Sequence, residues 1–202
     1  MIGSKEHILR VAFLLFLQKN YREVTMKELV EKTGLSKGAF YHYFESKEKL
    51  FFEIIDSFFS SILQFDFNGI RNNSLKEFYE DYFSTINTNR FKFFENEYEA
   101  GNDDILNLNF FSLLFDAFKF FPGFREKMKE YHARELNTWK NVIDNARKMN
   151  EIETPLSDEQ IAHVFIYTSD GFAMNLAMGM HEENWMSELK NMWDRFYETI
   201  KK

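Results

Sequence analysis

The 202-residue chain contains no cysteine and only two prolines and eight glycines. Without cysteine it can form no disulfide, no thiolate metal site and no cysteine nucleophile. Its turn-forming residues are too sparse for the many short strands of a β-sandwich. Hydrophobic residues make up 45% of the chain, and 25 of its residues are phenylalanine. This composition predicts an all-α protein with a sizeable core.

Long apolar runs are also missing. The longest, such as Val11 to Leu17, fall far short of the roughly 18 residues expected of a membrane-spanning helix. The first residues show no basic segment leading into an apolar stretch, so a secretory signal is not indicated. We therefore expect a soluble cytoplasmic protein that does not bind membranes.

The net charge of −7 is unevenly divided along the chain. Residues 1–53 hold 9 Lys and Arg against 7 Asp and Glu, which gives +2. Residues 54–202 hold 16 against 25, which gives −9. A mildly basic N-terminal segment on an acidic body is compatible with a polyanionic partner that contacts only that segment.

Helical periodicity and capping signals predict about nine helices. Three capping boxes, at residues 25–28, 74–77 and 157–160, mark helix starts, because each places Ser or Thr three residues before Glu or Gln. Seven of the expected helices span residues 5–19, 25–32, 37–44, 46–65, 122–149, 157–180 and 184–200. Two more begin at about residues 74 and 103. The helix after residue 102 is apolar nearly all round and is expected to be central.

Residues 25–50 predict a helix-turn-helix, in which two short helices flank a turn at Gly34 and the second helix enters the DNA major groove. The turn continues as Gly-Leu-Ser-Lys-Gly over 34–38, Tyr-His-Tyr-Phe over 41–44 and Lys-Glu-Lys-Leu over 47–50. With these motifs, residues 8–55 resemble the TetR family of transcriptional repressors. We place a functional boundary near residue 53, with a DNA-binding domain over 1–53 and an effector-binding and dimerisation domain over 54–202.

The resemblance implies a homodimer that reads a palindromic operator and responds to a small effector. Its helix 2 would contact phosphates or the groove edge, and the start of its recognition helix would face the bases. Carried over position by position, the DNA-binding residues are Thr25, Lys27, Ser36, Lys37, Gly38, Ala39, Tyr41, His42, Tyr43 and Lys47.

A physical argument independent of the family supports two of these positions. Lys37 and Lys47 stand beside helix N-termini, whose free N–H groups also attract phosphate, and Lys37 could instead donate to guanine. The alternative is that Lys27 is only a solvated charge. The aromatic residues at 42 and 43 could likewise be ordinary exposed side chains that do not contact DNA. Ala39 departs from the family, which often has Thr there, so the operator sequence stays open.

The large domain concentrates aromatic residues, with 12 of the 25 phenylalanines between residues 78 and 124. Aromatic side chains in a helical bundle can enclose a largely apolar ligand cavity with few polar groups. The alternative is that they simply form the core. Candidate ligand-binding residues are Tyr82, Phe83, Phe111, Phe115 and Trp139, with Asn109 or Asp116 as the polar member.

The last two predicted helices, about 157–180 and 184–200, resemble the family's dimerisation pair. The first carries small residues that allow close helix approach, namely Ala162, Ser169, Ala173 and Ala177. The second carries an apolar stripe of Trp185, Leu189, Trp193, Phe196 and Ile200. The alternative is that the same stripe packs within its own subunit.

Catalytic motifs are missing: the five histidines are scattered, and no HExxH motif or Gly-rich phosphate loop occurs. We expect no enzyme, no metal site and no cofactor. The function predicted is a dimeric transcriptional repressor that a small apolar or aromatic ligand releases from DNA. The alternative is a DNA-binding protein of the same fold whose large domain docks a protein partner.

Overall fold

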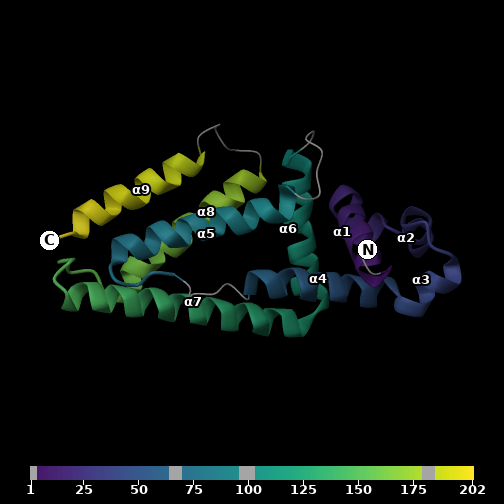
Figure 1. The fold of residues 1–202 in the computed structure, drawn as a ribbon, viewed down its shortest axis with the longest axis horizontal. Coiled ribbons are helices and arrows are strands. Elements are labelled where there is room, and N and C mark those ends of the chain that lie inside the picture. The colour runs from purple at the N-terminus through teal and green to yellow at the C-terminus, as the bar shows by residue number, and fades with distance from the viewer. Residues whose placement is uncertain (1–3, 64–69, 96–102, 179–184) are drawn as a thin grey trace. The chain divides into compact units, whose positions relative to one another are not determined.

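The computed structural model describes residues 4–63, 70–95, 103–178 and 185–202. Within the helices, the side chains at 58–63, 86–95, 103–110, 122, 176–177 and 185 fall outside this description, and with them those of Asn109, Ala177 and Trp185. The described residues form nine α-helices (Figure 1): α1 Ser4–Glu23, α2 Met26–Thr33, α3 Lys37–Tyr43, α4 Lys47–Leu63, α5 Leu75–Glu95, α6 Asp103–Phe120, α7 Pro122–Lys148, α8 Asp158–Ala177 and α9 Trp185–Ile200.

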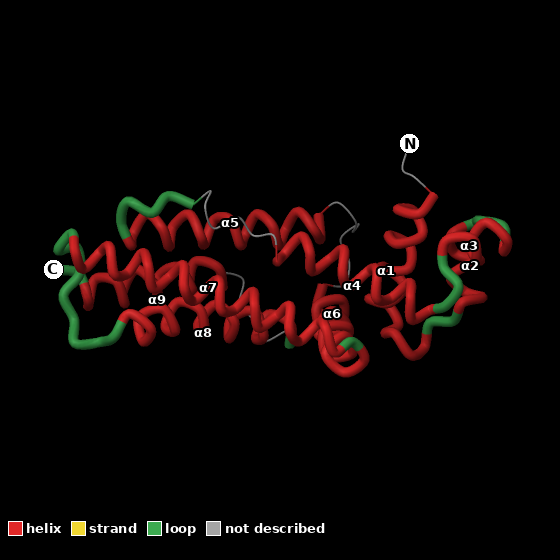
Figure 2. Tube along the Cα trace, turned by 90° about the horizontal axis from the view of Figure 1, so that it is seen from below, coloured by secondary structure: helices red, strands yellow, loops and turns green. Residues whose placement is uncertain are grey.

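The helix boundaries follow the capping residues that the sequence signals. The hydroxyl oxygens of Thr25, Ser74 and Ser157 each accept a hydrogen bond from the backbone N–H three residues on, at 3.0–3.2 Å. Gly34 ends α2 with φ of +68°, the left-handed conformation that favours glycine. The all-α class is confirmed, and apart from short turns the described chain is helical throughout (Figure 2).

The chain divides into two compact units, one of residues 1–64 with 102–128 and the other of residues 65–101 with 129–202. In the first unit α1 packs against α2, α4 and α6. Leu29, Phe40, Phe44 and Leu50 are buried there as predicted, whereas Leu35 is only half-buried. These two units are defined by packing, so they do not test the functional boundary near residue 53, which stays a prediction.

Helix α6 differs from expectation because it is not covered on all sides. Leu113 and Ala117 are buried, but Phe115 is 58% exposed and Phe120 is also exposed. An apolar helix in sequence therefore presents part of its aromatic surface to solvent in this unit.

The second unit is a bundle of α5, α8, α9 and most of α7 around an aromatic core. Trp139 stacks on Phe165 with ring centroids 4.7 Å apart, and Trp193 meets the same ring edge-on at 5.3 Å. The indole of Trp193 also donates to the Thr168 hydroxyl at 2.9 Å. Such close ring pairs fill a core densely.

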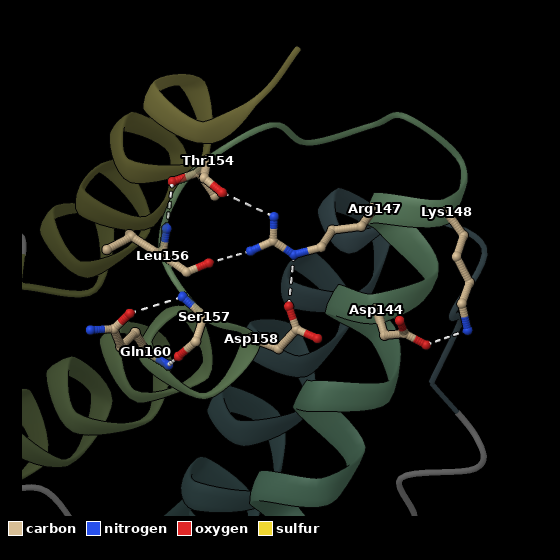
Figure 3. A network of polar contacts seen from close by, with 8 residues as sticks. All are labelled: Asp144, Arg147, Lys148, Thr154, Leu156, Ser157, Asp158 and Gln160. Atoms are coloured by element: carbon tan, nitrogen blue, oxygen red, sulfur yellow. Dashed lines mark hydrogen bonds and ion pairs between the residues drawn. The ribbon is translucent and has the colours of Figure 1, made fainter.

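Polar contacts close the turn between α7 and α8 (Figure 3). The Arg147 guanidinium pairs with Asp158 at 2.7 Å and donates to the carbonyls of Thr154 and Leu156. The Glu151 carboxylate in the same turn accepts from the backbone N–H of Leu75 at 2.9 Å and so caps α5. One side chain from the turn thus fixes the start of a distant helix.

The C-terminus is tied to the same turn by backbone hydrogen bonds. The N–H of Glu153 donates to the Ile200 carbonyl at 2.8 Å, and the N–H of Lys202 donates to the Glu151 carbonyl at 3.0 Å. Among the helices of the described ranges, none is both long and apolar enough to cross a bilayer.

Candidate nucleic-acid interface

Helix α3 is short and is anchored by one face only. Ser36 caps it by accepting a hydrogen bond from the Ala39 N–H at 3.2 Å. Phe40 and Phe44 point into the core, with 0% and 1% exposure. The remaining side chains of the helix are exposed. Two buried phenylalanines therefore fix the orientation of α3 and leave its whole outer face exposed to solvent.

That outer face carries one cation and three aromatic rings. The ammonium of Lys37 lies 5.8 Å from the ring centroid of Tyr41. The rings of His42 and Tyr43 meet edge-on at 5.2 Å. Tyr41 and Tyr43 are 37% and 41% exposed, so both hydroxyl-bearing rings are available to a ligand. Hydroxyls and a lysine suit phosphate oxygens and base edges.

Neither the backbone conformation of Gly38 nor the packing around it within its own unit requires a glycine. Its φ is not positive, and a Cβ built there would meet nothing within 4 Å. Glycine in a helix costs roughly 0.5–1 kcal/mol relative to alanine. A residue without a side chain on the exposed start of α3 fits a surface that another molecule approaches closely.

Helix α2 offers a second, weaker set of polar groups. The hydroxyl of Thr25 is used as the N-cap acceptor for Glu28. Lys27 has a side chain 87% exposed and lies 3.8 Å from Glu31, an exposed pair that contributes little. Its ammonium is therefore available to a phosphate.

Lys47 is placed differently from the other predicted contacts. Its ammonium donates to the backbone carbonyl oxygens of Tyr21 at 2.9 Å and Val24 at 2.8 Å. It also lies 4.5 Å from the Tyr21 ring centroid, in cation–π geometry. Two of its three N–H donors are thus directed at its own chain, so the ammonium acts as an internal anchor, and its contact with phosphate stays a prediction.

A break in α1 at Asn20 lies just before the two carbonyl groups that Lys47 binds. Asn20 has φ of +66° and ψ of 165°, outside helical values, although helix α1 continues to Glu23 beyond it. Its side-chain oxygen accepts from the N–H groups of Arg22 and Glu23 at 3.0 and 3.3 Å. The Asn20 side chain therefore caps N–H groups of the final turn of α1. The Lys47 ammonium binds the carbonyl oxygens of Tyr21 and Val24.

Comparison with known proteins decides the family. Residues 8–54 match the family model described as bacterial regulatory proteins, tetR family. Residues 8–54 thus belong to the TetR family. Members of this family are DNA-binding regulators and not enzymes, which agrees with the lack of catalytic motifs in the sequence.

Individual relatives are similar over part of the chain. An uncharacterized HTH-type transcriptional regulator of Bacillus subtilis, YerO, is 32% identical over 81 residues, which is 40% of this chain and 25% of the relative. The HTH-type transcriptional repressor KstR2 of Rhodococcus jostii is 30% identical over 60 residues, 30% of this chain and 29% of the relative. The aligned part thus spans less than a third of either relative's length.

Solved structures of the family share the fold over the whole chain. The ketosteroid transcriptional regulator KstR2 of Mycobacterium tuberculosis superposes with a TM-score of 0.65 at 14% identity, covering 100% of this chain and 97% of that one. A regulator from Aquifex aeolicus VF5 superposes with a TM-score of 0.62 at 21% identity, covering 96% and 99%. At these identities the likeness shows the fold, a helix-turn-helix domain followed by a helical domain.

The predicted ligand-binding residues are divided between the two units of the chain. Tyr82 and Trp139 lie in the core of the second unit, and Phe83 packs against that core. Phe111 and Phe115 lie on α6 in the first unit, together with Asp116. The first three lie together within one unit, and all five stay a prediction as ligand contacts.

The sequence prediction overlooked three residues that matter here. Asn20 and Tyr21 organise the break in α1, and a lone Asn before Tyr gives no distinctive signal. Glu135 is 5% exposed in the second unit. Its position one turn before Trp139 on an amphipathic helix is the signal that could have revealed a buried acid.

Proposed function

We propose that this protein is a dimeric transcriptional repressor that binds a palindromic operator and leaves it when a small ligand binds. The observation that carries the proposal is the outer face of α3, where Lys37, Tyr41 and Tyr43 project from a helix held by two buried phenylalanines. A rigid support reduces the entropy lost on binding. Two such helices, roughly 34–36 Å apart, would read successive major grooves.

The operator is found by selecting bound sequences from random duplex DNA with the full chain. Fluorescence anisotropy then measures affinity for the selected site. We expect the double variant Lys37→Ala with Tyr41→Ala to bind at least 100-fold more weakly. The control removes two exposed lysines of the second unit, Lys76→Ala with Lys129→Ala, and should bind normally. Equal affinities of the two double variants would refute the assignment of α3.

Dimerisation is proposed through exposed apolar residues of α8 and α9. The sequence stripe is already used inside the unit, because Leu189, Trp193 and Ile200 are buried in its core, as is Ala162. Among the described side chains of these helices, the large apolar ones left exposed are Tyr167, Met174 and Met192, and the exposed Met178 directly follows α8. Tyr167 and Met174 lie two turns apart on α8 and so share one of its faces.

This interface can be tested by replacing two of its exposed apolar residues with glutamate. Tyr167→Glu with Met178→Glu should convert the dimer to a monomer in analytical ultracentrifugation, because two buried carboxylates per subunit would lack partners. Met149→Glu, at another exposed methionine, is the control and should leave the mass unchanged. A double variant that remains dimeric would place the interface elsewhere.

The protein-partner alternative has one specific observation in its favour. A surface cavity of about 630 Å³ in the first unit is lined by Phe52 and Phe121 together with Glu53 and Asp56. Phe52 is 48% exposed, and exposed aromatic patches often mark interaction sites. If Phe52→Ser removes a response to a protein partner while no small molecule alters DNA affinity, the alternative replaces the ligand-released repressor.

A further inference from the structure

Helix α1 is tied by a hydrogen bond to the end of α2 that leads into α3. Nε2 of the His7 imidazole lies 3.0 Å from the backbone carbonyl oxygen of Thr33, which is 26 residues further along the chain. A carbonyl oxygen can only accept, so Nε2 carries the hydrogen of this bond. His7 is half-buried and directly precedes the fully buried Ile8. Helix α1 therefore supplies a well-anchored donor to the last residue of α2.

The carbonyl group that His7 binds belongs to a helix end. The last carbonyl groups of a helix lack an N–H partner within it. At the end of α2, the Val30 carbonyl accepts from the Thr33 hydroxyl at 3.0 Å, and the Glu31 carbonyl accepts from the Gly34 N–H at 3.3 Å. The Thr33 carbonyl accepts from His7. Because Thr33 is only 6% exposed, water cannot readily replace this bond if it is lost.

The position of Thr33 determines where α3 begins. Residues 34–36 are all that separates the two helices. Gly34 turns the chain in the left-handed conformation, and the Ser36 hydroxyl caps α3 by accepting from the Ala39 N–H at 3.2 Å. Both features are local to the turn, and so short a turn passes a displacement of Thr33 directly to the first residues of α3.

The buried phenylalanines of α3 act differently from this hydrogen bond. Phe40 and Phe44 fix which face of α3 is buried, but hydrophobic burial is non-directional. A hydrogen bond instead holds its two atoms within about 2.7–3.2 Å and at a preferred angle. The N-terminal residues of a recognition helix contact the base edges, and those contacts need the same narrow geometry. The bond at Thr33 therefore constrains the end of α3 where precision matters most.

A second polar contact between α1 and α2 lies at the opposite end of α2. The Lys19 ammonium donates to the Glu28 carboxylate at 2.6 Å, in the first turn of α2. The Lys19 side chain is 50% exposed, and exposed ion pairs contribute little to stability. Of these two contacts, the one made by His7 is the one next to α3.

We propose that His7 is a positioning residue for DNA recognition, which holds the Thr33 carbonyl and thereby fixes the turn between α2 and α3 and the base-reading end of α3. The inference rests on the proposed function, because it takes the outer face of α3 to be the surface that reads the operator. Phosphate contacts are independent of sequence. Loss of the bond should therefore reduce discrimination between the operator and other DNA more than it reduces general affinity for DNA.

Three substitutions separate the hydrogen bond from the bulk of the ring. His7→Gln places a donor N–H near the position of Nε2. The shorter His7→Asn places its amide near the position of Nδ1, too far from the Thr33 carbonyl to bind it. His7→Leu keeps apolar bulk without a donor. The matched control is Glu6→Leu, at the exposed neighbouring residue. Urea titration followed by circular dichroism checks that each variant is folded under the conditions of the binding assay.

Discrimination is measured by fluorescence anisotropy with the full chain, as the ratio of its affinities for the selected operator and for a duplex of shuffled sequence. We expect His7→Asn and His7→Leu to lower this ratio by about fivefold or more, because one mismatched base contact typically costs at least that much. His7→Gln and Glu6→Leu should keep the ratio of wild type. A smaller folded fraction would weaken binding to both duplexes equally, so a merely structural role would leave the ratio unchanged.

The outcomes that overturn the proposal are distinct from failure of the proposed function. A wild-type ratio in His7→Asn, or no rescue by His7→Gln, would overturn it, and so would failure of both His7→Asn and His7→Leu to fold. His7→Asn remains informative if His7→Leu alone is unfolded. The double variant Lys37→Ala with Tyr41→Ala is measured in parallel. If it binds the operator as wild type does, the proposed function fails; if it loses the operator while His7→Asn keeps the wild-type ratio, only the role of His7 fails.

Discussion

Replacing Lys47 with methionine separates two roles for this residue, phosphate contact and internal anchor. The TetR resemblance implies the first role. The structure gives its ammonium two carbonyl acceptors, those of Tyr21 and Val24, at 2.9 and 2.8 Å. Methionine keeps the apolar stem but removes the charge and the donors. The two roles then predict different changes in stability and in the salt dependence of DNA binding.

The loss of stability follows from the contacts removed. Hydrogen bonds to a charged group contribute roughly 1.5–3 kcal/mol each. Lys47 is only half-buried, so water replaces part of both bonds and the lower figure applies. The cation–π contact with Tyr21 contributes about 0.5–1 kcal/mol. We therefore expect Lys47→Met to lower the free energy of unfolding by about 3.5–4 kcal/mol, measured by urea titration followed by circular dichroism.

Salt dependence reports the phosphate role. Each phosphate contact on B-DNA contributes a slope of about −0.9 to log K against log salt, so one contact per subunit contributes about −1.8 in a dimer. We expect Lys47→Met to leave the slope unchanged while lowering affinity. The matched control is Lys27→Met, at an exposed lysine. It should make the slope less steep by about 1.8 without altering stability. If Lys47→Met instead loses that slope and unfolds as wild type does, the anchor role is refuted.

Three further predictions concern turns and charge. Gly34→Ala should lower the free energy of unfolding by about 1–2 kcal/mol because φ is +68°, whereas Gly38→Ala should stabilise slightly; equal effects in urea titration would contradict this. Arg147→Met should cost about 2–4 kcal/mol through its bonds in the α7–α8 turn, against under about 0.5 for Lys148→Met, an exposed helical pair. Because the pKa of Asp170 is raised to about 6, the folded state binds its proton more tightly, so its contribution to stability falls as pH rises from about 4 to 6. Asp170→Asn should therefore gain stability relative to wild type over that range in urea titrations, and a constant difference would count against it.

Local signals in the sequence were sufficient to predict most helix boundaries. Ser74 and Ser157 cap the predicted helices because the bond from the side-chain oxygen to the N–H three residues on needs no distant partner. Gly34 likewise ends α2 by its own backbone freedom. The outer face of α3 could be predicted from spacing, since the two phenylalanines four residues apart share its buried face.

Partners that are distant in sequence could not be predicted. Glu151 caps a helix that begins 76 residues earlier, and the apolar stripe with Trp193 fills the core of its own unit. Periodicity shows that a face is apolar but not which surface covers it. For Glu135 the sequence offers only its register with Trp139 on α7, because its burial depends on α5 and α8 as much as on its own helix.

Tyr21 connects α4 to α6 within the first unit. Its ring lies 4.4 Å from that of Phe51 on α4 and 5.8 Å from that of Phe120 on α6, and its carbonyl binds Lys47 at the start of α4. Burial, and then Glu48, raise the pKa of Tyr21 to about 12, so it remains a neutral hydroxyl at any physiological pH. A shift of α6 must therefore either move α4 or break this packing. Because allosteric coupling is typically 1–3 kcal/mol, the few contacts around one tyrosine are of the right size to link the two helices.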